Sequence, residues 1–214
     1  TDVVFTNYRV QGESKPRIDL TDSNIINWLE DNSVSLGNCL YKFPDLYFSI
    51  LKYQPIFSSS LTIRRSHYNS IGGISPTINN KDLGTVITSE DSHLIRRCSL
   101  TNGALFINSV LVTLGRQGDN TSHSYLSNLK GGKLILEDIL NNTCLTDKQA
   151  KETRKSIKLH NKEIARQIYY YDPPQNYIMC YIKNYKSQFD FKCHLHFIMS
   201  VIKYFKFKIF RWRD

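Results

Sequence analysis

The sequence predicts an α+β fold, in which a small mixed sheet packs together with several helices. Residues 3–10 (VVFTNYRV) and 104–114 (ALFINSVLVTL) are rich in β-branched and aromatic side chains, which favour strands. Residues 147–171 instead repeat apolar side chains at the spacing of a helix, with Lys and Arg at most other positions. Hydrophobic residues make up 41% of the chain, which is enough for a core.

Shorter helices are expected between these stretches. A helix over 22–31 follows Thr21, a typical N-cap residue. A second helix over 45–53 begins beside Pro44, which suits the first turn of a helix. A Gly-Gly pair precedes a third short helix over 133–141.

Two segments are expected to be loops. Residues 58–92 are rich in Ser, Gly, Asn and Thr and contain several turn signals. Residues 116–124 are polar throughout. Neither segment shifts the charge of the chain, so neither is taken as a domain boundary.

Residues 147–171 form the clearest element of the sequence. Thr146 and Gln149 fit the capping box Thr-x-x-Gln, in which each side chain caps a backbone amide of the other. The consecutive prolines at 173–174 stop the helix. The apolar stripe of this helix consists of Ala150, Thr153, Ile157, Ile164 and Ile168.

The segment 177–214 has a composition of its own, since 11 of its 38 residues are aromatic and eight are Lys or Arg. Three tyrosines recur at every fourth position from 177 to 185, as on one face of a helix. Apolar residues alternate with lysines over 205–209, which predicts a half-buried strand.

The positive charge is confined to the last third of the chain. Residues 1–146 carry 13 basic and 13 acidic side chains, whereas residues 147–214 carry 15 basic and six acidic ones. We therefore expect a charge-neutral globular body over 1–146, a basic helix with its Pro-Pro stop over 147–176, and a basic aromatic segment over 177–214. A polyanion is attracted first to the basic part of such a chain.

This charge pattern predicts a non-enzymatic protein that binds nucleic acid, RNA or DNA. Lysine and arginine neutralise phosphates, and interleaved aromatic side chains such as Trp212 can stack on unpaired bases. The predicted contacts to nucleic acid are Lys148, Lys151, Arg154, Lys155, Lys158, Lys162, Arg166, Lys203, Lys206, Lys208, Arg211 and Arg213.

The fragments Gly37-Asn38-Cys39 and His67-Tyr68-Asn69 suggest a different function. A cysteine with a later histidine is the minimum for a thiolate–imidazolium pair, and Asn69 can orient the imidazole. In this order the fragments resemble the motifs of OTU-type deubiquitinating cysteine proteases, although Leu36 replaces the Asp of that family. The resemblance implies Cys39 as nucleophile, His67 as general base and a ubiquitin-like protein as partner.

A third alternative is a peripheral membrane or protein-interaction module. A cationic segment with Phe and Trp side chains suits the interface of anionic lipids, where lysines and arginines contact the headgroups. The segment 177–214 has this composition.

The cysteine content favours an intracellular protein, which we expect to be soluble and to lie in the nucleus or cytoplasm. We expect no metal and no cofactor. An odd number of cysteines argues against a closed set of disulfides. Cys180, Cys193, His194 and His196 lack the close-spaced ligand pairs that zinc usually requires. Glycine fingerprints for phosphates or dinucleotides are absent from the sequence.

Overall fold

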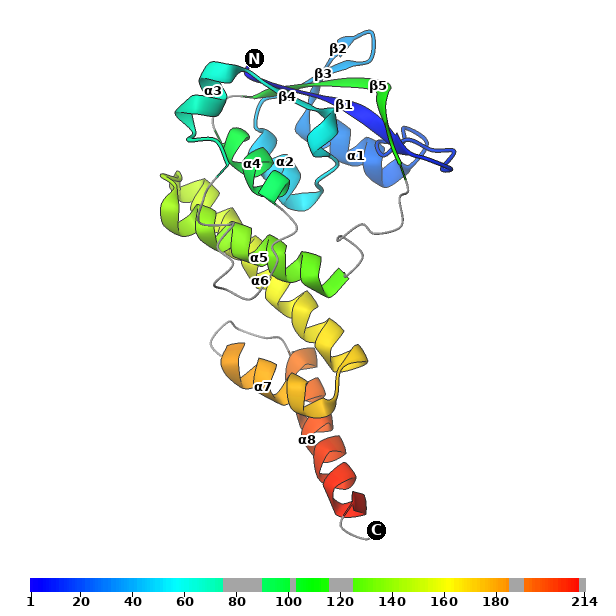
Figure 1. The fold of residues 1–214 in the computed structure, drawn as a ribbon, viewed down its shortest axis with the longest axis vertical. Helices are drawn as coiled ribbons and strands as arrows, with labels where there is room; N and C mark the ends of the chain where they lie inside the picture. Colours follow the sequence, from blue (N-terminus) through cyan, green and yellow to red (C-terminus); the bar gives the residue numbers. More distant parts are fainter. Residues whose placement is uncertain (75–89, 101–102, 116–124, 185–190, 212–214) are drawn as a thin grey trace.

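The computed structural model describes residues 1–74, 90–100, 103–115, 125–184 and 191–211, and it shows an α+β fold. A mixed five-stranded sheet lies at one end of the molecule, and helices extend from it to the C-terminus at the other end (Figure 1). The strands are β1 (Val3–Val10), β2 (Val34–Gly37), β3 (Leu40–Phe43), β4 (Leu61–Ile63) and β5 (Ala104–Leu114).

The two predicted strands, β1 and β5, form the centre of the sheet. The strand order is β2-β3-β5-β1-β4, with β1 parallel to β5 and the other pairs antiparallel. Phe5 of β1 stacks on Phe106 of β5 with ring centroids 5.0 Å apart. Both side chains are buried, so this pair lies at the middle of the main core.

A buried asparagine fixes the loop after β1 to the sheet. The register of β1 against β5 shifts on both sides of Asn7. The Asn7 amide nitrogen donates to the Ile18 carbonyl and to the Asn108 side chain, both at 2.8 Å. The Asn7 side-chain oxygen accepts from the Ile18 amide at 3.0 Å. Because Asn7 is 1% exposed, these bonds are shielded from water.

Eight α-helices lie within the described residues. Three of them, α1, α2 and α4, pack against one face of the sheet and complete the main core, which includes Trp28, Leu46 and Ile95. The helices are α1 (Ser23–Asn32), α2 (Leu46–Lys52), α3 (Arg65–Ser70), α4 (Glu90–Cys98), α5 (Tyr125–Asn142), α6 (Asp147–Tyr171), α7 (Pro174–Asn184) and α8 (Phe191–Arg211).

Helix α6 connects the sheet end of the molecule to α7 and α8. Its first half packs against α5 and α2, where the Tyr47 hydroxyl lies 2.7 Å from the Thr153 hydroxyl. Its second half contributes Ile164 and Ile168 to a separate core with α7 and α8. The predicted extent of this helix, 147–171, is confirmed.

The predicted boundaries of the other helices need correction. Asp22, not Thr21, caps α1, because its side chain accepts the Asn24 amide. Helix α5 begins at Tyr125 and runs through the Gly-Gly pair that was expected to precede it. A side chain at Gly132 would place its Cβ 3.0 Å from His160 Nε2, so glycine here permits the close approach of α5 and α6.

The predicted strand over 205–209 is wrong, since these residues belong to α8. Cys193, Phe197, Ser200 and Tyr204 are buried or half-buried at spacings of four and three residues, which is a helical repeat. The side chains of this longer repeat pack on α7. The helical repeat is therefore a stronger signal than the alternation of apolar residues and lysines over only five residues.

The region 58–92 was expected to be a loop, but its described part contains β4 and α3. The predicted loop over 116–124 and the third tyrosine of the 177–185 repeat lie outside the described residues. The division of the chain into three parts by charge stays a prediction.

We predict that Asn7→Ala lowers the free energy of unfolding by about 3 kcal/mol, because the variant cannot form the three buried hydrogen bonds and their partners stay buried. Urea denaturation followed by circular dichroism measures this change. The matched control is Asn24→Ala, at an exposed position of α1, which should change stability by less than about 0.5 kcal/mol. Equal effects of the two substitutions would show that the hydrogen bonds of the Asn7 side chain do not stabilise the fold.

Candidate functional site

The start of α6 is fixed by the capping box that the sequence predicts. The Gln149 amide donates to the Thr146 hydroxyl at 3.3 Å, and the Thr146 amide donates to the Gln149 side-chain oxygen at 3.0 Å. The Gln149 side-chain nitrogen also donates to the Leu100 carbonyl at 3.2 Å. The cap therefore ties the first turn of α6 to the turn that follows α4.

Seven basic side chains occupy one face of α6, which we call the α6 basic face. Its five lysines follow spacings of three and four residues, so they form one stripe along the helix. Thr153 and Ser156 are buried on the opposite side, where α6 contacts the body. The α6 basic face consists of Lys148, Lys151, Arg154, Lys155, Lys158, Lys162 and Arg166.

The α6 basic face keeps an excess of positive charge, because α6 carries seven basic residues and three acidic ones. Lys155 pairs with Glu152 at 2.7 Å, and Arg166 pairs with Glu163 at 2.8 Å. The hydrogen bond from Lys155 lowers the pKa of Glu152. Both pairs are solvent-accessible and lie within α6, and such pairs are weak. In both of these ion pairs the acidic partner belongs to α6 itself and not to the charge-neutral body.

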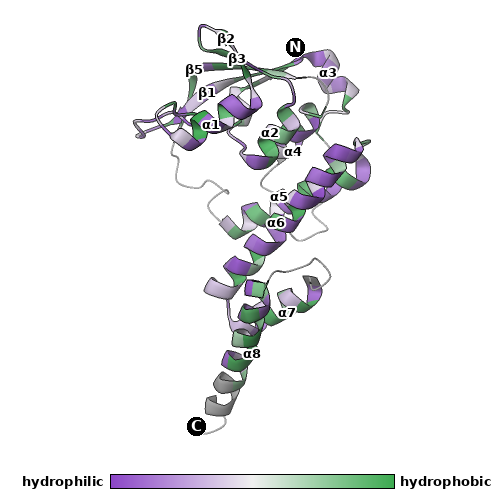
Figure 2. Cartoon of the chain, turned by 180° about the vertical axis from the view of Figure 1, so that it is seen from behind, coloured by the Kyte–Doolittle hydropathy of each residue, from purple (hydrophilic) through white to green (hydrophobic). Residues whose placement is uncertain are grey.

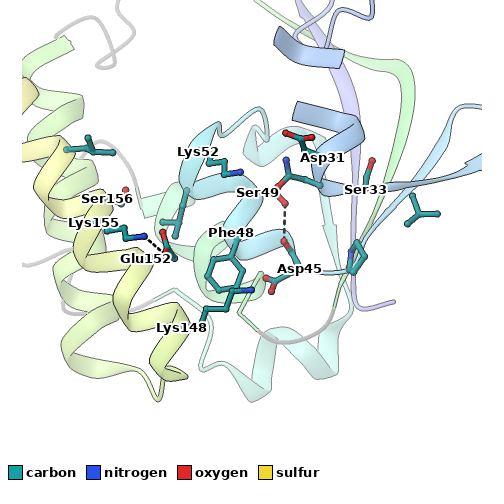
Figure 3. A pocket seen from close by; sticks show the side chains of 15 residues that line it. Asp31, Ser33, Asp45, Phe48, Ser49, Lys52, Lys148, Glu152, Lys155 and Ser156 are labelled. Atoms are coloured by element: carbon teal, nitrogen blue, oxygen red, sulfur yellow. Dashed lines mark hydrogen bonds and ion pairs between the residues drawn. The ribbon is translucent and has the colours of Figure 1, made fainter. Parts of the chain in front are cut away.

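A groove of about 650 Å³ lies beside the α6 basic face, between α6, α2 and the start of β2 (Figure 3). Lys148 extends from α6 across the groove, and its Nζ lies 4.6 Å from the centre of the Phe48 ring. The charged residues that line the groove are Asp31, Asp45, Glu152, Lys52, Lys148 and Lys155. With three charges of each sign, the groove itself has no net preference for an anion.

The other five predicted contacts to nucleic acid lie in the C-terminal segment, outside α6. Lys203 is exposed on α8, and its Nζ lies 5.0 Å from the centre of the Tyr169 ring. Lys206, Lys208 and Arg211 belong to α8, but their side chains lie outside the described part. Arg213, like Trp212, is beyond the described residues. Lys203 is thus the only one of these five whose side chain the structure describes.

Two of the tyrosines that were expected to lie on one helix face serve as core side chains. Tyr177 is 0% exposed, and its hydroxyl donates to the Cys193 carbonyl at 3.0 Å. Tyr181 is also buried, and its ring stacks on Phe197 with centroids 4.2 Å apart. Neither ring is available for stacking on a base.

The structure does not bring Cys39 and His67 together. Cys39 lies in the turn between β2 and β3 at one edge of the sheet. His67 lies in α3, directly after β4 at the opposite edge. His67 is buried, and its Nε2 lies 3.1 Å from the Cys98 carbonyl. Asn69 points away from His67, because residues two apart on a helix do not face each other.

The Gly-Asn-Cys fragment has a conformational explanation. Asn38 and Cys39 both have positive φ, 49° and 62°, and they form the two-residue loop of the β2–β3 hairpin. This is the geometry of a type I′ turn, which favours asparagine at its first position. The fragment therefore marks a hairpin turn, and the geometry gives no support to a cysteine hydrolase.

A buried polar cluster beneath α6 was not found from the sequence. Arg96 is buried, its Nε and Nη1 atoms have no hydrogen-bond partner among the described residues, and burial lowers its pKa to about 10. His93 Nε2 lies 2.9 Å from an Asp138 carboxylate oxygen, and His160 Nδ1 lies 2.9 Å from the Ser156 carbonyl. The contact between His93 and Asp138 joins α4 to α5, and no sequence signal could have identified it because the partners lie 45 residues apart in the chain. The contact between His160 and Ser156 lies within α6.

Within the described residues, no group of three or more His, Cys, Asp or Glu side chains is placed to hold a metal ion. None of the described helices has both the length and the apolar character needed to cross a membrane. Comparisons of the chain with models of protein families, with curated proteins and with solved structures found no match.

We predict that the protein loses stability as the pH falls below about 6.5, the ordinary pKa of histidine. Burial lowers the pKa of both His93 and His160, so the unfolded chain binds more protons than the folded one in this range. Denaturation at about pH 7.5 and about pH 5.5 measures the loss. It should be smaller in His160→Gln, and an unchanged loss in that variant would refute the assignment.

Proposed function

We propose that the protein binds nucleic acid, RNA or DNA, through the α6 basic face, as a binding protein and not as an enzyme. The observation that carries the proposal is the placement of seven basic side chains on the side of α6 that faces away from the buried Thr153 and Ser156. Five of the seven are exposed, and Lys158 and Lys162 are half-buried. The proposal relies on α6 alone and does not use the C-terminal segment.

The dimensions of the α6 basic face support this proposal. The α-helix rises about 1.5 Å per residue, so Lys148 and Arg166, which lie 18 positions apart, are separated by about 27 Å along the helix. One strand of a nucleic acid duplex advances about 3.4 Å per phosphate, so the stripe is as long as about eight phosphates. Lysines three or four residues apart lie about 5 Å apart along the helix, which matches one or two phosphate spacings.

The chemistry of the α6 basic face predicts binding that tolerates many sequences. Lysine contributes a point charge that neutralises a phosphate and releases condensed counterions. The face has five lysines but no Phe, Tyr or Trp between Lys148 and Arg166, so it offers no aromatic ring that stacks on a base. An intracellular location, in the nucleus or cytoplasm, forms part of the proposal because nucleic acid is found there.

We predict that Lys151→Glu combined with Arg154→Glu weakens binding of a fluorescent 20-nucleotide oligonucleotide at least about tenfold at 100 mM salt. Both side chains are exposed, so the fold should be unaffected. Fluorescence anisotropy at several salt concentrations measures the affinity. The slope of log K against log salt should also become shallower by about 0.7 to 0.9 for each phosphate that the variant no longer neutralises.

The matched control for this experiment is Arg9→Glu combined with Lys42→Glu. These two exposed basic residues lie on β1 and β3, away from α6, and the substitutions change the net charge by the same amount. The control should bind within about twofold of the unmodified protein. Equal losses in both double variants would show that only net charge matters, and the proposal would then be wrong.

A further inference from the structure

Helix α8 exposes a continuous row of large apolar side chains, which we call the α8 outer face. The row follows helical spacing, so its members project from one side of the helix. Phe191 is 80% exposed and Phe205 is 58% exposed. Figure 2 shows hydrophobic colouring along much of the described part of α8. The α8 outer face consists of Phe191, Leu195, Ile198, Met199, Ile202 and Phe205.

The α8 outer face is separate from the side of α8 that packs in the molecule. Cys193 and Ser200 are buried on the packed side, against α7 and α6. Each helical residue is rotated by about 100° from the previous one, which places Ile198 and Ile202 roughly opposite Ser200. Helix α8 is thus apolar on two sides, of which only one is covered. Exposed apolar patches of this kind mark interaction sites.

The charge around the α8 outer face has one sign. Lys192 and Lys203 of α8 are exposed beside it, and Lys183 is exposed on α7. The described residues of α7 and α8 include no Asp or Glu. The surface that covers the α8 outer face must therefore be apolar at its centre and anionic around it.

A second copy of this chain fits that requirement poorly. Antiparallel pairing of two α8 helices about Ile198 would place Lys192 of one copy beside position 204 of the other. Lys203 of that other copy would then lie within one turn of Lys192. Like charges so close destabilise a pair, and no described acidic residue of α7 or α8 could offset them.

We infer that the α8 outer face lies on the surface of an anionic lipid bilayer. The six apolar side chains enter the interface between headgroups and acyl chains, and Lys192 contacts the lipid phosphates. Lys203, whose Nζ lies over the Tyr169 ring, adds positive charge beside the face. Helix α8 is suited to this because it lies at the end of the molecule opposite the sheet (Figure 1). It would lie in the plane of the bilayer and not cross it.

Vesicle flotation with the full chain tests this inference. The protein should float with vesicles that contain about 30% phosphatidylserine and should not float with pure phosphatidylcholine. Ile198→Glu combined with Ile202→Glu should lower the partition coefficient at least about tenfold. Ile198→Ser combined with Ile202→Ser, which adds no charge, should also lower it, because insertion of the apolar side chains is impaired.

The matched control is Val34→Glu combined with Leu36→Glu, which changes two exposed apolar residues of the edge strand β2. This variant should float like the unmodified protein. The inference is overturned if the unmodified protein does not float, or if the Ile198 and Ile202 variants float as well as the control. It is also overturned if light scattering shows a dimer that these variants dissociate, because a second copy would then cover the face.

The outcome does not depend on the proposed binding of nucleic acid. The two Ile198 and Ile202 variants should bind the oligonucleotide with unchanged affinity, since α8 takes no part in that proposal. Loss of both activities in these variants would instead indicate a general effect on the fold, which their circular dichroism spectra would reveal.

Discussion

The packing of α6 on the charge-neutral body determines which surfaces the rest of the molecule exposes. Thr153 is 0% exposed, and its hydroxyl lies 2.7 Å from that of Tyr47, which is also completely buried. The Thr153 hydroxyl donates in turn to the Gln149 carbonyl at 2.7 Å, so the Tyr47 hydroxyl donates to Thr153. This series of hydrogen bonds fixes the rotation of α6 about its own axis.

That rotation decides the direction of the α6 basic face. With Thr153 and Ser156 turned toward the body, Lys151 and Lys155, each two residues from Thr153, are exposed to solvent. The same helix then supplies Ile164 and Ile168 to the core with α7 and α8. Helix α6 therefore positions two surfaces of different chemistry, a charged one along its own length and an apolar one on α8.

The sequence predicted those features that depend on residues close together in the chain. The capping box at Thr146 and Gln149 needs only four consecutive residues, and the limits of α6 were predicted correctly. The strands over 3–10 and 104–114 were also correct. Periodicity alone left a buried helix open for 104–114, and the β-branched and aromatic side chains there favoured a strand. The α+β class follows from the presence of both patterns.

The predictions from the sequence were wrong where contacts with residues distant in the chain determine the conformation or the role of a residue. Gly132 lies inside α5, where the absence of a side chain permits the close approach of His160 on α6, and nothing near Gly132 in the sequence indicates this. Tyr177 and Tyr181 fill a core between three helices, although the basic and aromatic composition of the segment 177–214 was typical of a binding surface. The hairpin turn at Cys39 resembled a catalytic fragment because a type I′ turn also selects small and polar residues.

Lysine acetylation with and without a bound oligonucleotide, read by mass spectrometry, tests the central claim most directly. The account predicts that nucleic acid protects Lys148, Lys151, Lys155, Lys158 and Lys162 of α6. Lys183, Lys192 and Lys203 of α7 and α8 should remain as reactive as in the protein alone. Protection of the lysines on α7 and α8, with none on α6, would contradict the account.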